Sequence, residues 1–113
     1  MKFLISALIA FSISSQTLAI GSVNGKVIQV RIDQDGRGMV VFDQQIGGTP
    51  ATCVNPVYTN ALSFNTTSVG GKGIMAMALT AKATGATVNV YGTGACDIYG
   101  GAYVEDWSYG VIQ

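Results

Sequence analysis

One segment of the chain departs from the alternating spacing of apolar residues, and this single departure limits the possible folds more than any other feature. In residues 23–32 apolar side chains alternate with polar ones, at Ile28, Val30 and Ile32, which is typical of a half-buried strand. Between residues 74 and 81 the apolar positions recur every three or four residues, the period of an amphipathic helix. Alternation then returns. The sequence therefore predicts a mainly β fold that contains a single helix.

Turn chemistry places the remaining elements between these segments. Asp and Gly tolerate the backbone angles of tight reversals, so residues 33–38 are expected to join two strands as a hairpin. Gly85 stands where a helix C-cap belongs. The expected order is a strand at 23–32, a turn at 33–38, a strand at 39–42, a loop at 47–50, short extended segments at 52–54 and 61–66, a helix that begins at Ser68 or the glycines after it, a strand at 87–91, a loop at 92–102 and a last strand at 103–112.

This order of elements fits a known small architecture. A five-stranded Greek-key barrel with one helix between its third and fourth strands, the OB-fold, has the same succession of strands and helix. A small open α+β sheet is the alternative. The pattern alone leaves both possibilities open.

The first 19 residues follow the pattern of a secretory signal peptide. A positive start at Lys2 precedes the apolar run 3–13, and small residues at Thr17 and Ala19 suit cleavage after Ala19. The run is too short to span a bilayer, which takes about 20 apolar residues, and we expect no membrane span after it. The sequence thus predicts export, to the periplasm or outside the cell, of one domain made of residues 20–113.

Export also predicts how the two cysteines are used. Cys53 and Cys96 are the only cysteines in the chain, and oxidising compartments favour disulfides. They lack the Cys-x-x-Cys spacing of redox-active thiols. We therefore expect one structural disulfide between them, with a stabilising effect of about 4 kcal/mol on the chain-entropy model.

Charge and composition exclude several classes of function. The expected mature domain carries five basic and six acidic side chains, a net charge of −1, with the basic residues scattered singly. Nucleic-acid binders and polybasic membrane patches require clustered Lys and Arg. The chain has no histidine, the commonest general base and metal ligand. We expect no nucleic-acid partner, no catalytic activity, no metal and no cofactor.

Two loops carry side chains suited to binding sugars. Sugar recognition uses carboxylate and amide groups for hydroxyls and an aromatic face for the apolar side of the ring, and OB-folds place binding residues in the first hairpin loop and in the loop between the last two strands. The alternative is that these residues are ordinary solvated turns. The candidate residues are Asp33, Asp35 and Arg37 in the first loop and Asp97, Tyr99 and Tyr103 in the last.

The last expected strand carries three aromatic residues at alternate spacing. Tyr103, Trp107 and Tyr109 are expected on one face, with Glu105 among them. This face suits either a stacking platform or, more simply, a core or subunit interface, where aromatic residues bury most area. Glu105 and Asp106 are adjacent and are expected to point to opposite faces, which excludes a catalytic carboxylate pair.

A resemblance to a known family is carried by two stretches. Residues 79–90 (Leu-Thr-Ala-Lys-Ala-Thr-Gly-Ala-Thr-Val-Asn-Val), followed by Cys96 and the glycines at 100–101, resemble the end of the helix and the next strand of the Shiga toxin B subunit. Residues 23–27 (Val-Asn-Gly-Lys-Val) look like the first strand of that family. The resemblance touches about half of the expected mature domain.

The resemblance implies an OB-fold, a ring of five B subunits whose helices line the centre, binding of host-cell glycans and an enzymatic A subunit as a possible partner. It implies a sugar-binding role for Asp35, and it places a subunit contact on the helix. The chain departs from the family at two places, so the properties of the family do not all carry over. Ser22 stands where the family has the second cysteine of its disulfide, and Lys72 and Gly73 stand where it has a Trp-Asn pair that helps to bind sugar. The candidate subunit-contact residues are Met75, Ala78, Leu79 and Lys82.

Two functional hypotheses follow. The first is an exported carbohydrate-binding module that acts without catalysis and assembles into a homo-oligomer. The second is a structural or protein-interaction domain of the same fold, which predicts no glycan binding and an apolar surface that recruits a protein.

Overall fold

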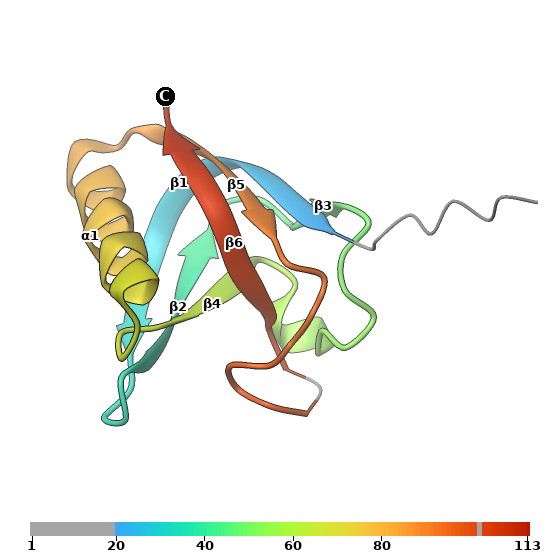
Figure 1. The fold of residues 1–113 in the computed structure, drawn as a ribbon. Helices are drawn as coiled ribbons and strands as arrows, with labels where there is room; N and C mark the ends of the chain where they lie inside the picture. The colour runs from blue at the N-terminus through green and yellow to red at the C-terminus, as the bar shows by residue number, and fades with distance from the viewer. Residues whose placement is uncertain (1–19, 102) are drawn as a thin grey trace, which may run out of the picture.

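The structure is a computed structural model that describes residues 20–101 and 103–113. The predicted signal peptide, residues 1–19, lies outside the described residues. Strands and one helix succeed one another as expected, with the helix after the third of the longer strands (Figure 1). The elements are β1 (Gly21–Ile32), β2 (Arg37–Phe42), β3 (Gly47–Gly48), the short 3-10 helix η1 (Pro56–Tyr58), β4 (Ala61–Asn65), α1 (Val69–Thr84), β5 (Thr87–Gly92) and β6 (Glu105–Ile112).

All six strands belong to one sheet, in the order β2-β4-β6-β5-β1-β3. The long strand β1 has three antiparallel partners: its first half pairs with β5 on one side and, at its very start, with the short β3 on the other, and its second half pairs with β2. The pair β4 and β6 is parallel, and the other pairs are antiparallel. Following the pairings from β1 through β2, β4, β6 and β5 leads back to β1. Figure 1 shows these strands curving around a common interior.

Apolar side chains from the strands fill that interior, and α1 covers it on one side. Trp107 is 6% exposed and packs against Phe42, with ring centroids 6.1 Å apart. The small residues Ala78 and Ala81 of α1 are buried in the same cluster, which lets the helix approach the strands closely. Burial at about 25 cal/mol per Å² of apolar surface makes this cluster the main favourable contribution to folding.

The helix begins and ends where the sequence predicts. The Ser68 hydroxyl accepts a hydrogen bond from the Gly71 N–H at 3.0 Å, the usual role of an N-cap side chain. Gly85 adopts the left-handed conformation with φ of 68°, and its N–H donates to the Ala81 carbonyl. Both ends are thus determined by local residues.

The buried face of β1 differs from the prediction. Ile28 and Ile32 are about half exposed, whereas Val23 and Val27 are buried. Val27 pairs with Phe42 and Gln29 with Val41, so Ile28 is an extra residue in a β-bulge. The bulge reverses which positions face the core, so Ile28 points outward and Val30 packs against the core. Ile32 lies on the same face as Val30 but is half exposed, because it ends the strand beside the hairpin turn. The expected burial is therefore wrong at Ile28 and Ile32 and right at Val30.

Three expected boundaries are also wrong. Residues 52–54, expected to be extended, lie in turns, because the chain reverses there before η1. Residues 47–48, expected to be loop, form the short strand β3 against the start of β1. The last strand begins at Glu105 and not at residue 103. The other predicted strands match the structure within three residues.

The predicted disulfide is confirmed. Cys53 and Cys96 are bonded, with their Cα atoms 6.2 Å apart and 43 positions separating them in the sequence. The bond connects the loop before η1 to the loop between β5 and β6. In the described part of the chain, no helix has the length and apolar character needed to cross a bilayer.

Candidate functional site

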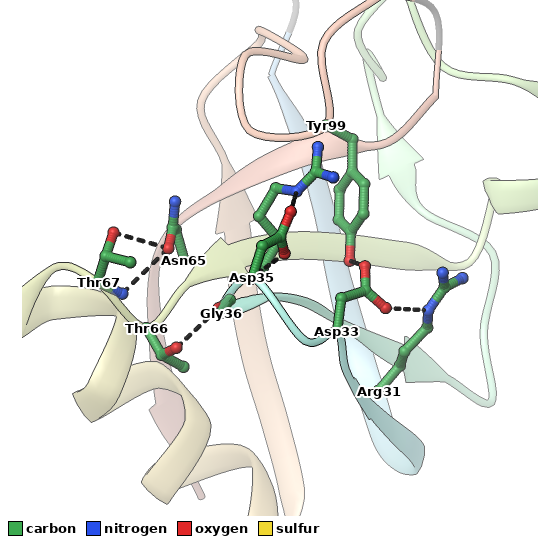
Figure 2. Close-up of polar contacts among 9 residues, drawn as sticks. Arg31, Asp33, Asp35, Gly36, Asn65, Thr66, Thr67 and Tyr99 are labelled. Carbon is green, nitrogen blue, oxygen red and sulfur yellow. Dashed lines mark hydrogen bonds and ion pairs between the residues drawn. The ribbon is translucent and has the colours of Figure 1, made fainter.

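The first hairpin turn holds its acidic residues in a fixed geometry. The Asp33 N–H donates to the Arg37 carbonyl at 2.7 Å, and the Gly36 N–H donates to the Asp33 carbonyl at 3.0 Å. Gly36 has a φ of 93°, a conformation that favours glycine. From the segment before α1, the Thr66 hydroxyl donates to the Gly36 carbonyl at 2.7 Å (Figure 2). The turn is therefore anchored on both sides.

A tyrosine from the last loop reaches this turn. The Tyr99 hydroxyl donates to Asp33 Oδ2 at 2.6 Å, across 66 positions of sequence, and Arg31 Nε donates to Asp33 Oδ1 at 2.8 Å. Figure 2 shows Asp33 between the Tyr99 hydroxyl and the Arg31 guanidinium. The two loops predicted to bind sugar are thus in direct contact.

These contacts shift the proton affinities of all three groups. The Tyr99 hydrogen bond, followed by that of Arg31, lowers the pKa of Asp33. Burial and the hydrogen bond to Asp33 raise the pKa of Tyr99. The Asp33 hydrogen bond and charge raise the pKa of Arg31, with a small further effect of the Tyr58 hydroxyl. At neutral pH the cluster therefore holds a carboxylate, a neutral phenol and a guanidinium.

The second arginine of the site is held by Asp35 and by an aromatic ring. Arg37 Nε donates to Asp35 Oδ2 at 2.6 Å, and the Arg37 N–H donates to Asp35 Oδ1 at 3.1 Å. Its guanidinium carbon lies 4.9 Å from the centroid of the Tyr99 ring, a cation–π contact. Tyr99 therefore contacts the first hairpin through both its hydroxyl and its face.

A cavity of about 260 Å³ opens beside this cluster. Its walls combine two guanidinium groups with three phenol rings and one thioether. Met39 is buried in a small core cluster against which Tyr58 and Tyr99 pack, so core packing holds these three lining side chains together. The residues that line it are Arg31, Arg37, Met39, Tyr58, Tyr99 and Tyr103.

Buried carboxylates on β6 fix the loop that carries Tyr99. Asp106 accepts hydrogen bonds from the N–H groups of Asp97 and Ile98, at 2.9 and 3.1 Å, and from the Ser63 hydroxyl at 3.0 Å. Together with the disulfide at Cys96, these bonds determine the path of the loop. Asp106 is thus a positioning residue for the site, and it does not line the cavity.

Glu105 holds a different set of segments together. Its side chain is fully buried and accepts from the N–H groups of Gly21, Ala51 and Gly94, at 2.9, 2.7 and 3.3 Å. It lies at a second cavity of about 360 Å³, which is walled mainly by apolar residues of 46–56. The separate partners of Glu105 and Asp106 fit the expectation that they point apart.

The structure places only some of the predicted site residues at the cavity. Arg37, Tyr99 and Tyr103 line the cavity, and Asp33 binds Tyr99 from behind. Asp35 contacts the site only through Arg37, and Asp97, an exposed residue, does not line the cavity.

Sequence reasoning missed Arg31, Met39 and Tyr58. Arg31 is the last residue but one of β1, just before the predicted turn, so its alternation with the apolar residues Val30 and Ile32 was a usable signal. Tyr58 lies in η1, about 40 positions before Tyr99, and no local pattern connects the two residues. Only the tertiary fold brings Tyr58 to the site.

The predicted aromatic face of the last strand is wrong. Trp107 is buried in the core, whereas Tyr109 is 58% exposed and stacks on Tyr91 with ring centroids 4.7 Å apart. Trp107 pairs with Gly92 and Tyr109 with Tyr91, so Ser108 between them is the extra residue of a β-bulge. This bulge turns Tyr109 to the outer face, and Tyr103 precedes the strand altogether.

The candidate subunit-contact residues lie on different sides of α1. Ala78 is fully buried in the core of its own chain, and Met75 is partly buried against the same core. Leu79 is 49% exposed, and Lys82 is exposed. Only Leu79 and Lys82 are therefore available on the outer side of the helix. Within residues 20–101 and 103–113, no group of three or more His, Cys, Asp or Glu side chains is placed to hold a metal ion.

The cavity is suited to binding. Its aromatic faces can stack on a flat apolar surface, and its guanidinium groups can donate several directed hydrogen bonds. Comparisons of the chain with protein-family models, with curated proteins and with solved structures give no match. The function is therefore inferred from the chemistry of this cavity.

Proposed function

We propose that the protein is a carbohydrate-binding module that acts without catalysis or a cofactor, and that the cavity beside Tyr99 is its binding site. The observation that carries the proposal is the convergence of the first hairpin and the last loop on one cavity. Three tyrosines and two arginines line it, from segments far apart in the sequence. Exposed aromatic rings next to directed donors are the combination that a sugar ring requires, because the ring has an apolar face and a polar edge.

The proposal includes an OB-fold. The pairing of β1 with both β2 and β5, the parallel contact of β4 with β6, and the helix between β4 and β5 support it. In OB-folds the first hairpin and the loop between the last two strands border the ligand site, which is where the cavity lies. The resemblance to toxin B subunits agrees with this placement.

We further propose export and self-association. The disulfide supports an oxidising compartment, secreted or periplasmic, and the mature chain is expected to begin at Ile20. The exposed Leu79 and Lys82 on α1 support a homo-oligomer assembled through the helices. Light scattering of the oxidised protein should give about five times the monomer mass, and a monomer would refute the ring. An enzymatic A subunit is a further partner that the resemblance implies.

The binding proposal is tested by glycan arrays and titrations with matched tyrosine variants. Tyr103 lines the cavity and is 49% exposed, whereas Tyr109 is 58% exposed and lies outside it. Tyr103→Ala should lower glycan affinity at least about tenfold, if packing of a sugar ring on the phenol ring contributes as much as the stacking of a nucleobase on an aromatic side chain, on the order of 1–3 kcal/mol. Tyr109→Ala should leave the affinity unchanged.

The Asp35 carboxylate gives a second, independent test. Asp35→Ala removes the partner of Arg37 Nε without touching the cavity wall, so it should weaken binding less than Tyr103→Ala does. The absence of any bound glycan on a broad array, or equal losses for Tyr103→Ala and Tyr109→Ala, would refute the proposal and favour the protein-interaction hypothesis.

A further inference from the structure

The polar groups at the binding cavity are strongly biased towards donors. The four carboxylate oxygens of Asp33 and Asp35 all accept hydrogen bonds from the protein itself: those of Asp33 from Arg31 and Tyr99, and those of Asp35 from Arg37. Both aspartates, which sequence reasoning assigned to sugar hydroxyls, therefore have partners within the protein. They serve to hold the arginines and Tyr99 in place.

The arginines, by contrast, keep most of their donors for a ligand. Arg31 and Arg37 each donate to an aspartate through Nε. The side-chain hydrogen bonds found among the described residues include none from their terminal Nη atoms, although the Tyr58 hydroxyl lies near enough to the Arg31 guanidinium to raise its pKa slightly. A guanidinium has five N–H donors. Both side chains line the cavity, and they are 46% and 36% exposed.

The cavity wall presents only the cationic partner of each ion pair. Both cationic side chains line the cavity, whereas neither Asp33 nor Asp35 is among the residues that line it. The aspartates balance the arginines overall, so the long-range field at the site is weak. A ligand inside the cavity nevertheless meets the cationic groups first and at short range, where directed hydrogen bonds dominate.

From this arrangement we infer that the cavity selects glycans that carry an anionic group, a carboxylate or a sulfate, over their neutral counterparts. This inference rests on the proposed function, since it specifies the ligand of the same site. A carboxylate is an acceptor only, with two oxygens that match the fork of a guanidinium. A neutral hydroxyl must also find an acceptor for its own proton, and neither aspartate lines the cavity to provide one; among the lining side chains the tyrosine hydroxyls can accept, more weakly than a carboxylate would. The tyrosine rings remain available for the sugar ring itself.

The test compares matched ligands that differ in one group. Methyl glucoside and methyl glucuronide have the same sugar ring, but the glucoside carries a CH₂OH group where the glucuronide carries a carboxylate. Methyl glucoside 6-sulfate is the third ligand and tests a sulfate at the same position. Binding is followed by NMR shifts of the tyrosine rings, at low and at moderate ionic strength. The glucuronide or the sulfate should bind at least about tenfold tighter than the glucoside, equivalent to about 1.4 kcal/mol, and the better of the two identifies the anionic group.

Charge-neutralising variants assign the preference to the two arginines. Arg31→Gln and Arg37→Gln should each reduce the preference to less than about threefold, measured as the ratio of the affinities of the same variant for the anionic and the neutral sugar. Lys82→Gln removes the same charge from an exposed helix position outside the cavity and should leave the preference unchanged. Thermal unfolding of each variant checks that the fold is intact.

The outcomes separate the inference from the proposed function. Equal binding of neutral and anionic sugars overturns the inference and leaves carbohydrate binding in place. An anionic preference that survives both arginine substitutions, or that Lys82→Gln removes equally, also overturns it. If none of the three sugars and no glycan on a broad array binds, both the inference and the proposed function are refuted.

Discussion

Glu105→Gln should be among the most destabilising single substitutions of this protein, although it changes the side chain by only one atom. The carboxylate is fully buried and accepts from three backbone N–H groups in three separate segments. Glutamine offers one oxygen and one NH₂ group. If its oxygen keeps the two N–H donors of Gly21 and Gly94, its NH₂ group must face the N–H of Ala51.

The expected magnitude follows from these bonds. A buried N–H left without an acceptor costs about 1–3 kcal/mol, and two hydrogen bonds to a charged group become neutral ones, a loss of about 1 kcal/mol each. The sum is about 3–5 kcal/mol, against a total stability of about 5–15 kcal/mol for a typical domain. Guanidinium unfolding of the oxidised protein measures the difference from the shift in midpoint at constant m value.

Asp43→Asn is the matched control. The Asp43 carboxylate also accepts a backbone N–H, that of Lys26 at 2.8 Å, but it does so at an exposed position. Its substitution should cost less than about 1 kcal/mol, because water replaces the lost acceptor. The opposite expectation is that the free-energy cost of burying the charge of Glu105 exceeds the stabilisation from its three hydrogen bonds. A Glu105→Gln protein as stable as wild type, or more stable, would refute the reasoning above in favour of that view.

Three further predictions concern the loops and the helix. Replacing Cys53 and Cys96 together by serine should lower the free energy of unfolding by about 4 kcal/mol for a closed loop of this length, measured by denaturant unfolding with and without reductant. Tyr99→Phe removes the main cause of the low Asp33 pKa, so that pKa should rise in an NMR titration. The stability contributed by Asp33 is present above its unfolded pKa of about 3.9 and lost as pH falls through the lower folded value, so the variant should lose stability mainly at neutral pH. Gly85→Ala should cost about 1 kcal/mol in thermal unfolding, because a side chain there meets no atom but must adopt a φ of 68°.

The local elements of this fold are largely readable from the sequence. The helix ends at Ser68 and Gly85 depend on a hydroxyl and on a left-handed backbone conformation, both of which are properties of single residues. The change from a two-residue to a helical period identified the strands around the helix. The pairing of the two cysteines followed from their number and from the predicted export, and the structure confirms it.

Which side chains of each strand point into the core could not be predicted from the sequence in the same way. The bulges at Ile28 and Ser108 each insert one residue, and each reverses which side chains point inward. A bulge depends on how two strands meet, so alternation along a single strand does not reveal it. For this reason the prediction missed the buried face of Val23 and Val27 before the first bulge. It also failed at Ile28 and Tyr109, whereas it succeeded at Val30 after the first bulge.

The candidate binding site likewise has features that the sequence predicts and others that depend on the tertiary structure. The sequence by itself determined which residues carry the chemistry of the two loops, since Asp33, Arg37 and Tyr99 stand out by type and by position in turns. Only the tertiary structure decided what each residue does. It joins Tyr99 to Asp33 across 66 positions and adds Tyr58 from η1 to the cavity wall. It also uses the aspartates to hold arginines, where the sequence suggested that they would hold sugar hydroxyls. The physical reason is that residue type sets what a side chain can donate or accept, whereas long-range packing sets which partner it finds.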